Sequence, residues 1–232
     1  MKMPKVCPWW LTYTFDNPLR KFIQDPEEIL SRHIREGMRV ADIGCGMGYF
    51  SIPLARLVGD SGYVQAVDLQ PQQLKRVEKR ARKSGVSARI TTTLSGEDSL
   101  LLNPDTDFIL AFAVIHEVPS TENLFNQMYE SLKPGGRILI AEPSHHVKQK
   151  AFDEEIETAR KCGFTPVPKS QKIRASRVAL LEKPVKNAEV RSQKSEVRSQ
   201  KSEVRNQKSE VRSQKSEVRS QKSEVRSQKS NK

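Results

Sequence analysis

The chain has 232 residues, which is enough for one ordinary domain with an appendage and too few for two full catalytic domains. Apolar residues make up 36% of the chain, and the formal net charge is +12. No stretch approaches the roughly 20 apolar residues that span a membrane, and the first residues, MKMPKVCPWW, lack the apolar core of a signal peptide. We therefore expect a cytoplasmic protein with no membrane partner.

The cysteines bear on redox state and on metal binding. Cys7, Cys45 and Cys162 are odd in number and widely spaced. This pattern favours reduced thiols over a disulfide framework or a zinc site. We predict no metal site at these cysteines.

Residues 1–37 are predicted to form an aromatic and helical cap. Trp9, Trp10, Tyr13 and Phe15 precede the stretch DNPLRKFIQDPEEILSRHI, which contains a short helical pattern. Packing against the edge of a sheet is the commoner fate of such aromatic side chains. A lid that contacts the substrate is the alternative.

Residues 38–183 alternate apolar runs with amphipathic stretches, a pattern typical of an α/β sheet with helices on both faces. Strands are expected near 38–43, 63–67, 88–93, 107–113, 136–141, 164–168 and 174–182. Helices are expected near 48–58, 71–84, 120–132 and 147–162, and the third crossover, around 97–102, is short.

The segment RVADIGCGMGYFSIPLA carries the clearest sign of a cofactor. An apolar strand ends at Asp42 and is followed by Gly44, Gly46 and Gly48 before a helix. Glycines allow positive φ angles and a close approach of the backbone to a ligand. The start of the helix presents free N–H groups to polar groups of that ligand.

A second predicted strand ends at Asp68, 20 residues after Gly48. A carboxylate at that place can accept hydrogen bonds from both hydroxyls of a ribose. A dinucleotide fingerprint would need Gly or Ala at the position of Tyr49, whose side chain is too large for close packing of strand and helix. The spacing therefore argues against a nicotinamide or flavin fold.

Several motifs in order resemble the class I S-adenosylmethionine-dependent methyltransferases, over nearly all of residues 38–183. The family's fold is a three-layer, Rossmann-like, seven-stranded and mostly parallel sheet, in which the last two strands form an antiparallel hairpin. LKPGGRILIAEP resembles the family's fifth-strand signature, and GFTPVPKSQKIRASRVALLEK fits the hairpin. The resemblance predicts this fold, methyltransferase activity and S-adenosylmethionine as the cofactor.

The resemblance also implies the residues that hold the cofactor. VADIGCGMG looks like the glycine motif that holds the methionine end, and VDL looks like the motif that places Asp68 on the ribose and Leu69 on adenine. SGEDSL is similar to the third motif, near the adenine amino group, although it differs from the usual Gly-Asp-Ala. The predicted cofactor residues are Asp42, Gly44, Cys45, Gly46, Gly48, Asp68, Leu69, Glu97, Asp98 and Ala113.

Polar residues follow the fourth and fifth predicted strands. The fourth strand ends at His116 and Glu117, and the fifth ends at Glu142, shortly before His145 and His146. Ligands of open α/β sheets bind beyond the carboxyl ends of the strands. We favour His116 as a base or a substrate-orienting group, assisted by Glu117 and Glu142, because neutral imidazole titrates near physiological pH. Ordinary loop polarity and a metal site for a chelating acceptor are the alternatives.

The acceptor is expected to be a small molecule. The Asn-Pro-Pro-Tyr type of motif that accompanies methylation of exocyclic base amines is replaced by FAVIHEVP. Two other functions stay open: an RNA methyltransferase, and a regulator that binds S-adenosylmethionine without turnover.

Residues 184–232 are predicted to be a disordered linker and tail. Glu189–Ser230 consists of six copies of EVRSQKS with one departure, Asn206. A coiled coil needs two apolar positions in each heptad, and this unit offers only valine. The DNA word GTCAGAA, repeated through all three reading frames, encodes this heptapeptide, so we infer that a DNA repeat entered the reading frame. The repeat and Lys232 add +7 of charge, and we expect at most weak electrostatic contact between this tail and nucleic acid.

Overall fold

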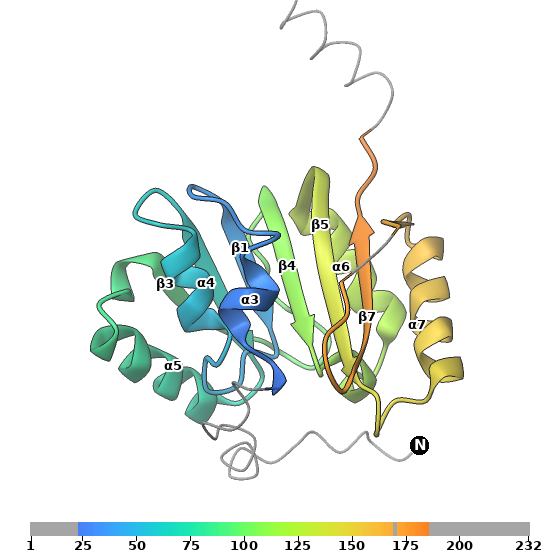
Figure 1. The fold of residues 1–232 in the computed structure, drawn as a ribbon, viewed down its shortest axis with the longest axis horizontal. Helices are drawn as coiled ribbons and strands as arrows, with labels where there is room; N and C mark the ends of the chain where they lie inside the picture. Colours follow the sequence, from blue (N-terminus) through green and yellow to red (C-terminus); the bar gives the residue numbers. More distant parts are fainter. Residues whose placement is uncertain (1–22, 169–170, 186–232) are drawn as a thin grey trace, which may run out of the picture. The chain divides into compact units, whose positions relative to one another are not determined.

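The computed structural model describes residues 23–168 and 171–185, which form one sheet with helices on both faces (Figure 1). The strands are β1 (Arg39–Ile43), β2 (Tyr63–Asp68), β3 (Ile90–Leu94), β4 (Thr106–Phe112), β5 (Leu132–Pro143), β6 (Thr165–Pro166) and β7 (Ser176–Glu182). The helices are α3 (Pro26–Leu30), α4 (Ser51–Leu57), α5 (Pro71–Lys83), α6 (Thr121–Ser131) and α7 (Gln149–Lys161), with short 3₁₀ turns η1 (Ser87–Arg89) and η2 (Ile115–Glu117).

The strand order is β3-β2-β1-β4-β5-β7-β6. β1 pairs in parallel with β2 and β4, β2 with β3, and β4 with β5. β7 is antiparallel to both β5 and β6. The predicted seven-stranded, mostly parallel sheet with an antiparallel ending is confirmed.

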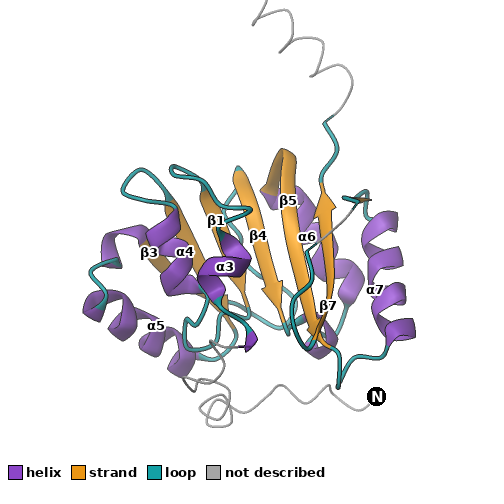
Figure 2. Cartoon of the chain, in the orientation of Figure 1, coloured by secondary structure: helices purple, strands orange, loops and turns teal. Residues whose placement is uncertain are grey.

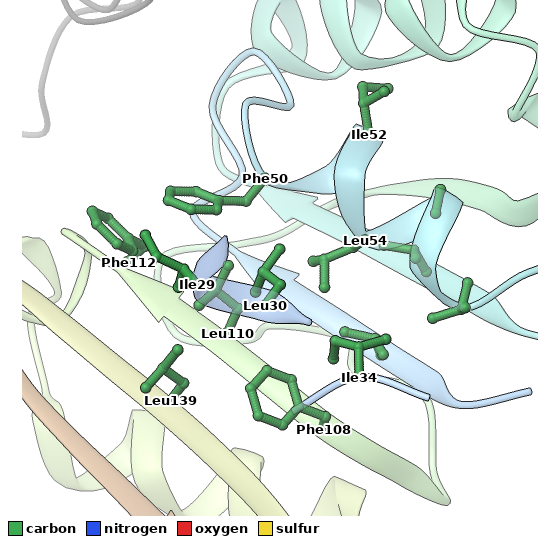
Figure 3. Close-up of a cluster of buried hydrophobic side chains, with 14 of the residues drawn as sticks. Ile29, Leu30, Ile34, Phe50, Ile52, Leu54, Phe108, Leu110, Phe112 and Leu139 are labelled. Carbon is green, nitrogen blue, oxygen red and sulfur yellow. The ribbon is translucent and has the colours of Figure 1, made fainter. Parts of the chain in front are cut away.

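Helices cover both faces of the sheet (Figure 2), and an apolar core lies between the sheet and the helices on each face. On one face, Ile29 and Leu30 of α3 and Leu54 of α4 pack with Phe108 and Leu110 of β4 (Figure 3). On the other face, the apolar sides of α6 and α7 pack against alternate residues of the same strands. This alternation follows from the period of two in a strand and gives the three layers of the fold.

The order of the strands reverses between β1 and β4, because the chain goes from β1 to β2 on one side and returns to β4 on the other. Open α/β sheets bind ligands at such a point, beyond the carboxyl ends of the strands. Asp42, Asp68, Phe112 and Pro143 all lie at or next to the carboxyl end of a strand. The fold therefore brings the predicted glycine loop and the predicted His and Glu cluster to one edge.

Several element boundaries differ from the sequence prediction. The helix expected at 48–58 starts only at Ser51, because the positive φ angles of Gly46 and Gly48 keep the chain in a turn. The strand expected at 164–168 is reduced to Thr165–Pro166, since proline lacks the N–H group that would continue the ladder. No helix spans 95–105 in the described chain, in accord with the short third crossover.

The predicted cap is described only in part. Within residues 1–37, α3 contributes Ile29 and Leu30 to the core that also contains Phe108 and Leu110, and Ile34 is buried in the same core. The aromatic residues before residue 23 and the repeat from Glu189 onward lie outside the described residues. The disordered tail predicted from the sequence falls in this part as well. The boundaries at 37 and 183 stay predictions. Among the described residues, no helix has the length and apolar character needed to cross a membrane.

Candidate active site

The glycine loop after β1 turns back over the carboxyl end of the sheet. Gly44, Gly46 and Gly48 have φ angles of +66°, +52° and +81°, in the left-handed region that favours glycine. A Cβ atom at Gly44 would lie 2.6 Å from Cγ2 of Val114, so close packing against the residues after β4 demands this glycine. A Cβ atom at Gly46 would meet nothing within 4 Å, so this backbone borders open space.

Asp68 holds the glycine loop in place. Its Oδ2 accepts a hydrogen bond from the backbone N–H of Gly46 at 2.9 Å, and its Oδ1 accepts one from the N–H of Gln70 at 2.9 Å. Burial raises the pKa of Asp68, and the hydrogen bonds from Gln70 and Gly46 oppose that shift. The backbone N–H of Leu69 also donates to this carboxylate, which has about four lone-pair sites, so Asp68 keeps acceptor capacity for a ribose hydroxyl.

Asp42 lies one strand away from Asp68, and its side chain is buried. Its Oδ2 accepts a hydrogen bond from the hydroxyl of Ser51 at 2.5 Å, which ties β1 to the start of α4. Cys45 donates its backbone N–H to Val67, and its thiol is buried. Burial, followed by the charges of Asp42 and Asp68, raises the pKa of this thiol well above its ordinary value. Cys45 is therefore a neutral packing group in the loop.

The motif SGEDSL is joined to the end of β2 by a backbone hydrogen bond. The N–H of Ser95 donates to the carbonyl of Asp68 at 3.0 Å. Glu97 and Asp98 are both exposed in the loop that follows. The carbonyl of Asp98 accepts hydrogen bonds from Asn123 and Gln127 of α6. Leu69, directly after β2, is half-buried. The loop thus has a fixed backbone and acidic side chains that are open to solvent.

Glu142, at the end of β5, is the centre of a second group of contacts. Its side chain is fully buried, and its Oε1 accepts hydrogen bonds from the backbone N–H groups of Val114 and Ile115 at 3.1 and 2.9 Å. These groups are presented because Ala113, just after β4, has a φ angle of +57°. A non-glycine residue in this region is strained, and such strain is frequent at functional sites.

His116 completes this group. Its Nδ1 pairs with Oε2 of Glu142, and its Nε2 lies 3.9 Å from Oε1 of Glu117. Burial lowers the pKa of His116, but the hydrogen bond and charge of Glu142 and the charges of Glu117 and Glu155 raise it by more, so the pKa is raised overall. The structure therefore brings together the three residues that the sequence marked as catalytic candidates.

The other histidines divide into two groups. His145 and His146 are both exposed, and the ring of His146 lies edge-on to the ring of His116, with 4.9 Å between the centroids. His33 stacks on Phe108 in the core, far along the strand from this edge. Residues 23–168 and 171–185 contain no group of three or more His, Cys, Asp or Glu side chains arranged to hold a metal ion.

The sequence motifs did not point to Ser51, Val114 and Glu155, which also contribute to this edge. Glu155, on α7, carries a buried carboxyl oxygen near the cluster. Its spacing from Phe152 and Ala159 places it on the apolar face of the helix, and this signal was available in the sequence. Ser51 and Val114 depend on packing between separate elements, which no local pattern shows.

A groove of about 300 Å³ lies elsewhere on the domain, lined by Ser99, Leu101, Leu102 and the end of α6. The lining residues Pro104 and Ser131 come just before the starts of β4 at Thr106 and β5 at Leu132. The groove therefore lies at the opposite end of these strands from His116 and Glu142.

Residues 34–177 match the family described as a methyltransferase domain. The chain belongs to this methyltransferase family. The resemblance stated from its motifs is thus confirmed, and the family implies S-adenosylmethionine as the cofactor. The open space beside Gly46 and the buried carboxylates of Asp42 and Asp68 at neighbouring strand ends fit this cofactor.

Curated relatives of this methyltransferase include two bacterial proteins named ubiquinone/menaquinone biosynthesis C-methyltransferase UbiE. The protein from Erwinia tasmaniensis is 32% identical over 126 residues, which are 52% of this chain and 49% of that protein. The one from Shewanella sediminis is 31% identical over 131 residues, 54% of this chain and 51% of that protein. The chain spans about half the length of the curated relatives it matches.

Solved structures show the same fold. A SAM dependent methyltransferase from Aquifex aeolicus superposes with a TM-score of 0.68 and 22% identity, covering 77% of this chain and 100% of that chain. The [4+2]-cyclase SpnF superposes with a TM-score of 0.59 and 16% identity, covering 69% of this chain and 81% of that chain. Because a methyltransferase and a cyclase share this fold, the fold alone does not determine the reaction, which depends on the residues of the site.

Proposed function

We propose that this domain transfers a methyl group from S-adenosylmethionine to a small-molecule acceptor, and that His116 takes the proton of the acceptor. The pair formed by His116 and the fully buried Glu142 carries this proposal. The pair lies where β4 and β5 end, at the edge that also holds the glycine loop. Val114 links the two parts directly, since its side chain packs on Gly44 and its N–H group donates to Glu142.

Different residues would contact the two ends of the cofactor. When bound, S-adenosylmethionine supplies a sulfonium methyl group that a nucleophile can displace in line. The backbone around Gly46 would lie against its methionine end, and Asp68 would accept hydrogen bonds from its ribose hydroxyls. Leu69, Glu97 and Asp98 would lie around its adenine.

Glu142 fixes the proton of His116 on one ring nitrogen. A carboxylate can only accept hydrogen bonds, so Nδ1 of His116 must donate to it. In the neutral ring, Nε2 then carries the free lone pair and is the atom that can accept a proton. Glu117, 3.9 Å from Nε2, stabilises the imidazolium that forms. Orientation by Glu142 and charge from Glu117 are thus separate roles.

The class of acceptor follows from the chemistry of this base and from the relatives. The relatives are named as C-methyltransferases of ubiquinone and menaquinone biosynthesis. A carbon of a hydroxylated aromatic ring becomes a stronger nucleophile when the ring hydroxyl loses its proton, which His116 can accept. We therefore propose a hydroxylated aromatic ring as the first acceptor class to test. A cytoplasmic location stays a prediction from the sequence.

The test measures production of S-adenosylhomocysteine by the full chain over a panel of acceptors, with a labelled methyl donor to trace the product. The panel includes quinols, simple phenols and total RNA. His116→Ala should lower turnover by about 100-fold or more, with little change in affinity for S-adenosylmethionine. His145→Ala is the matched control, because it removes an exposed histidine of the same edge.

Three outcomes would contradict the proposal. Near-normal turnover in His116→Ala would remove the proposed base. Methylation of RNA alone would move the acceptor to a macromolecule. Binding of S-adenosylmethionine without S-adenosylhomocysteine from any acceptor would favour a regulator that has lost turnover.

A further inference from the structure

Glu155 occupies a place on α7 where an apolar residue is expected. It follows the buried Phe152 by three residues and precedes the buried Ala159 by four, so the three share one face of the helix. The other acidic residues of α7, Asp153, Glu154 and Glu157, are exposed. Glu155 is therefore the acidic residue of α7 that faces the core.

The carboxyl group of Glu155 is poorly satisfied in the part of the chain that the structure describes. Its Oε2 is buried and has no hydrogen-bond partner there. A buried carboxylate without a partner is costly, and the neutral acid is favoured instead. Burial, followed by the charge of Glu142, raises the pKa of Glu155 to about 7, although the charge of His116 opposes the shift.

The charges of His116 and Glu155 act on one another. The charge of Glu155 helps to raise the pKa of His116, and the charge of His116 lowers that of Glu155. The groups that face His116 are Glu142 of β5, Glu117 of η2, Glu155 of α7 and His146 of the loop after β5. Glu142 and His116 are the groups that act on Glu155.

We propose that Glu155 is a positioning residue for the base, one whose buried carboxyl group gains and loses its proton in response to the charge of His116 and so sets the fraction of His116 able to accept a proton from the acceptor. This rests on the proposed function, in which His116 is that base. When His116 takes the proton of the acceptor on Nε2, the imidazolium favours ionisation of Glu155, which releases its own proton to water. When His116 later gives up its proton, Glu155 takes one back, so the protons balance over a turnover.

The consequence is a coupled titration. When two titrating groups are coupled, their protons leave in macroscopic steps that belong to the pair. In the unaltered protein, the ring signals of His116 should therefore follow a two-step curve. Replacing Glu155 by glutamine removes the second titrating group and a negative charge, so His116 should titrate in one step at lower pH.

The experiment follows the imidazole signals of His116 by NMR in the full chain between pH 5 and 9, without cofactor or acceptor. Glu155→Gln should lower the midpoint of His116 by on the order of half a pH unit or more. Glu157→Gln, an exposed residue of the same helix, is the matched control and should leave the midpoint unchanged. An unchanged midpoint in Glu155→Gln, or an equal shift in both variants, would overturn the proposal.

A second measurement covers the case in which Glu155→Gln does not fold. The carboxyl carbon of Glu155 in the unaltered protein should titrate near pH 7, and a midpoint near that of an ordinary glutamate would overturn the proposal. Neither measurement uses catalysis. If His116→Ala keeps its turnover while the titrations are coupled, the proposed function fails and the coupling stands.

Discussion

The carboxylate of Asp68 accepts a hydrogen bond from the backbone N–H of Gly46, 2.9 Å away and 22 residues earlier in the chain. This contact joins the end of β2 to the loop that follows β1. It gives Asp68 two tasks, because the carboxylate that would bind the ribose also fixes the glycine loop that would bind the methionine end. Removal of this side chain should therefore disturb both ends of the cofactor.

Asp68→Ala should weaken binding of S-adenosylmethionine by about 1 to 3 kcal/mol, the range expected when buried hydrogen-bonding groups lose their partner. Asp68→Asn keeps one acceptor oxygen, so its affinity for S-adenosylmethionine should lie between that of the unaltered protein and that of Asp68→Ala. Isothermal calorimetry measures both, with Asp60→Ala, which removes an exposed carboxylate, as the control. Unchanged affinity in Asp68→Ala would show that the ribose lies elsewhere.

Gly44→Ala should destabilise the fold, since its Cβ atom would lie 2.6 Å from the side chain of Val114. Left-handed backbone costs a residue with a Cβ about 1 to 2 kcal/mol, and crowding adds about 1 to 3 kcal/mol. The added substitution Val114→Ala should recover much of the crowding energy, and thermal unfolding of the four proteins in a double-mutant cycle tests this. A loss that is the same with and without Val114 would exclude the contact as its cause.

Gly46→Ala should behave differently from Gly44→Ala. Its Cβ atom would meet nothing within 4 Å, so only the backbone strain acts on stability. The same Cβ would stand in the space proposed for the cofactor. Calorimetry should therefore show a larger loss of affinity for S-adenosylmethionine than of stability, and the reverse result would place the cofactor away from Gly46.

The stability of the domain should fall as the pH rises through the region where Glu155 and His116 titrate. Burial raises the pKa of Glu155 to about 7 in the folded state, above its unfolded value, so the folded chain holds a proton that the unfolded chain releases. The pKa of His116 is also raised, and its contribution is present below its unfolded pKa and lost as the pH rises through the folded one. Both contributions have the same sign.

Melting temperatures of the unaltered protein and of Glu155→Gln check this dependence between pH 5 and pH 8. The unaltered protein should lose stability relative to the variant over that range, since glutamine does not ionise. A constant difference between the two proteins would show that Glu155 titrates normally in the folded state.

A chain that ends at Pro184 should fold and bind S-adenosylmethionine as the full chain does. Near the end of the described residues, Nζ of Lys183 donates to the carbonyls of Tyr129 and Leu132, both at 2.7 Å. A chain that ends at Leu180 is the control, since it loses these contacts and the fully buried Leu181. It should melt at a lower temperature, whereas a drop of several degrees on removal of the repeat alone would assign the repeat a structural role.

The layers and the cofactor loop could be predicted from the sequence because their signals are local. Apolar runs alternate with amphipathic stretches over residues 38–183, and three glycines follow Asp42 at the end of a strand. The exact start of α4 could not be predicted, since it depends on backbone angles at Gly46 and Gly48. The two-residue length of β6 depends on pairing with β7, which lies later in the chain.

The candidate catalytic group was predictable only as a set of residue types near two strand ends. The sequence placed His116 and Glu142 after strands expected to be neighbours, and the register of β4 on β5 brings them together. The strain at Ala113 and the buried oxygen of Glu155 arise from packing between elements distant in sequence. The helical period of α7 places Glu155 on the buried face, but no periodicity or motif gives the contacts that are made there.

The place of β7 inside the sheet has a consequence for the synthesis of this protein. β5 pairs with β7 along Arg137–Pro143, so one side of β5 stays without its partner until the ribosome has made Ser176–Glu182. Translation at ~5 to 20 residues per second leaves that apolar strand with an open edge for seconds. Open edges invite pairing with other chains. The nascent chain is therefore most vulnerable to aggregation between the emergence of β5 and that of β7, and a translational pause in this interval would lower the yield of folded protein.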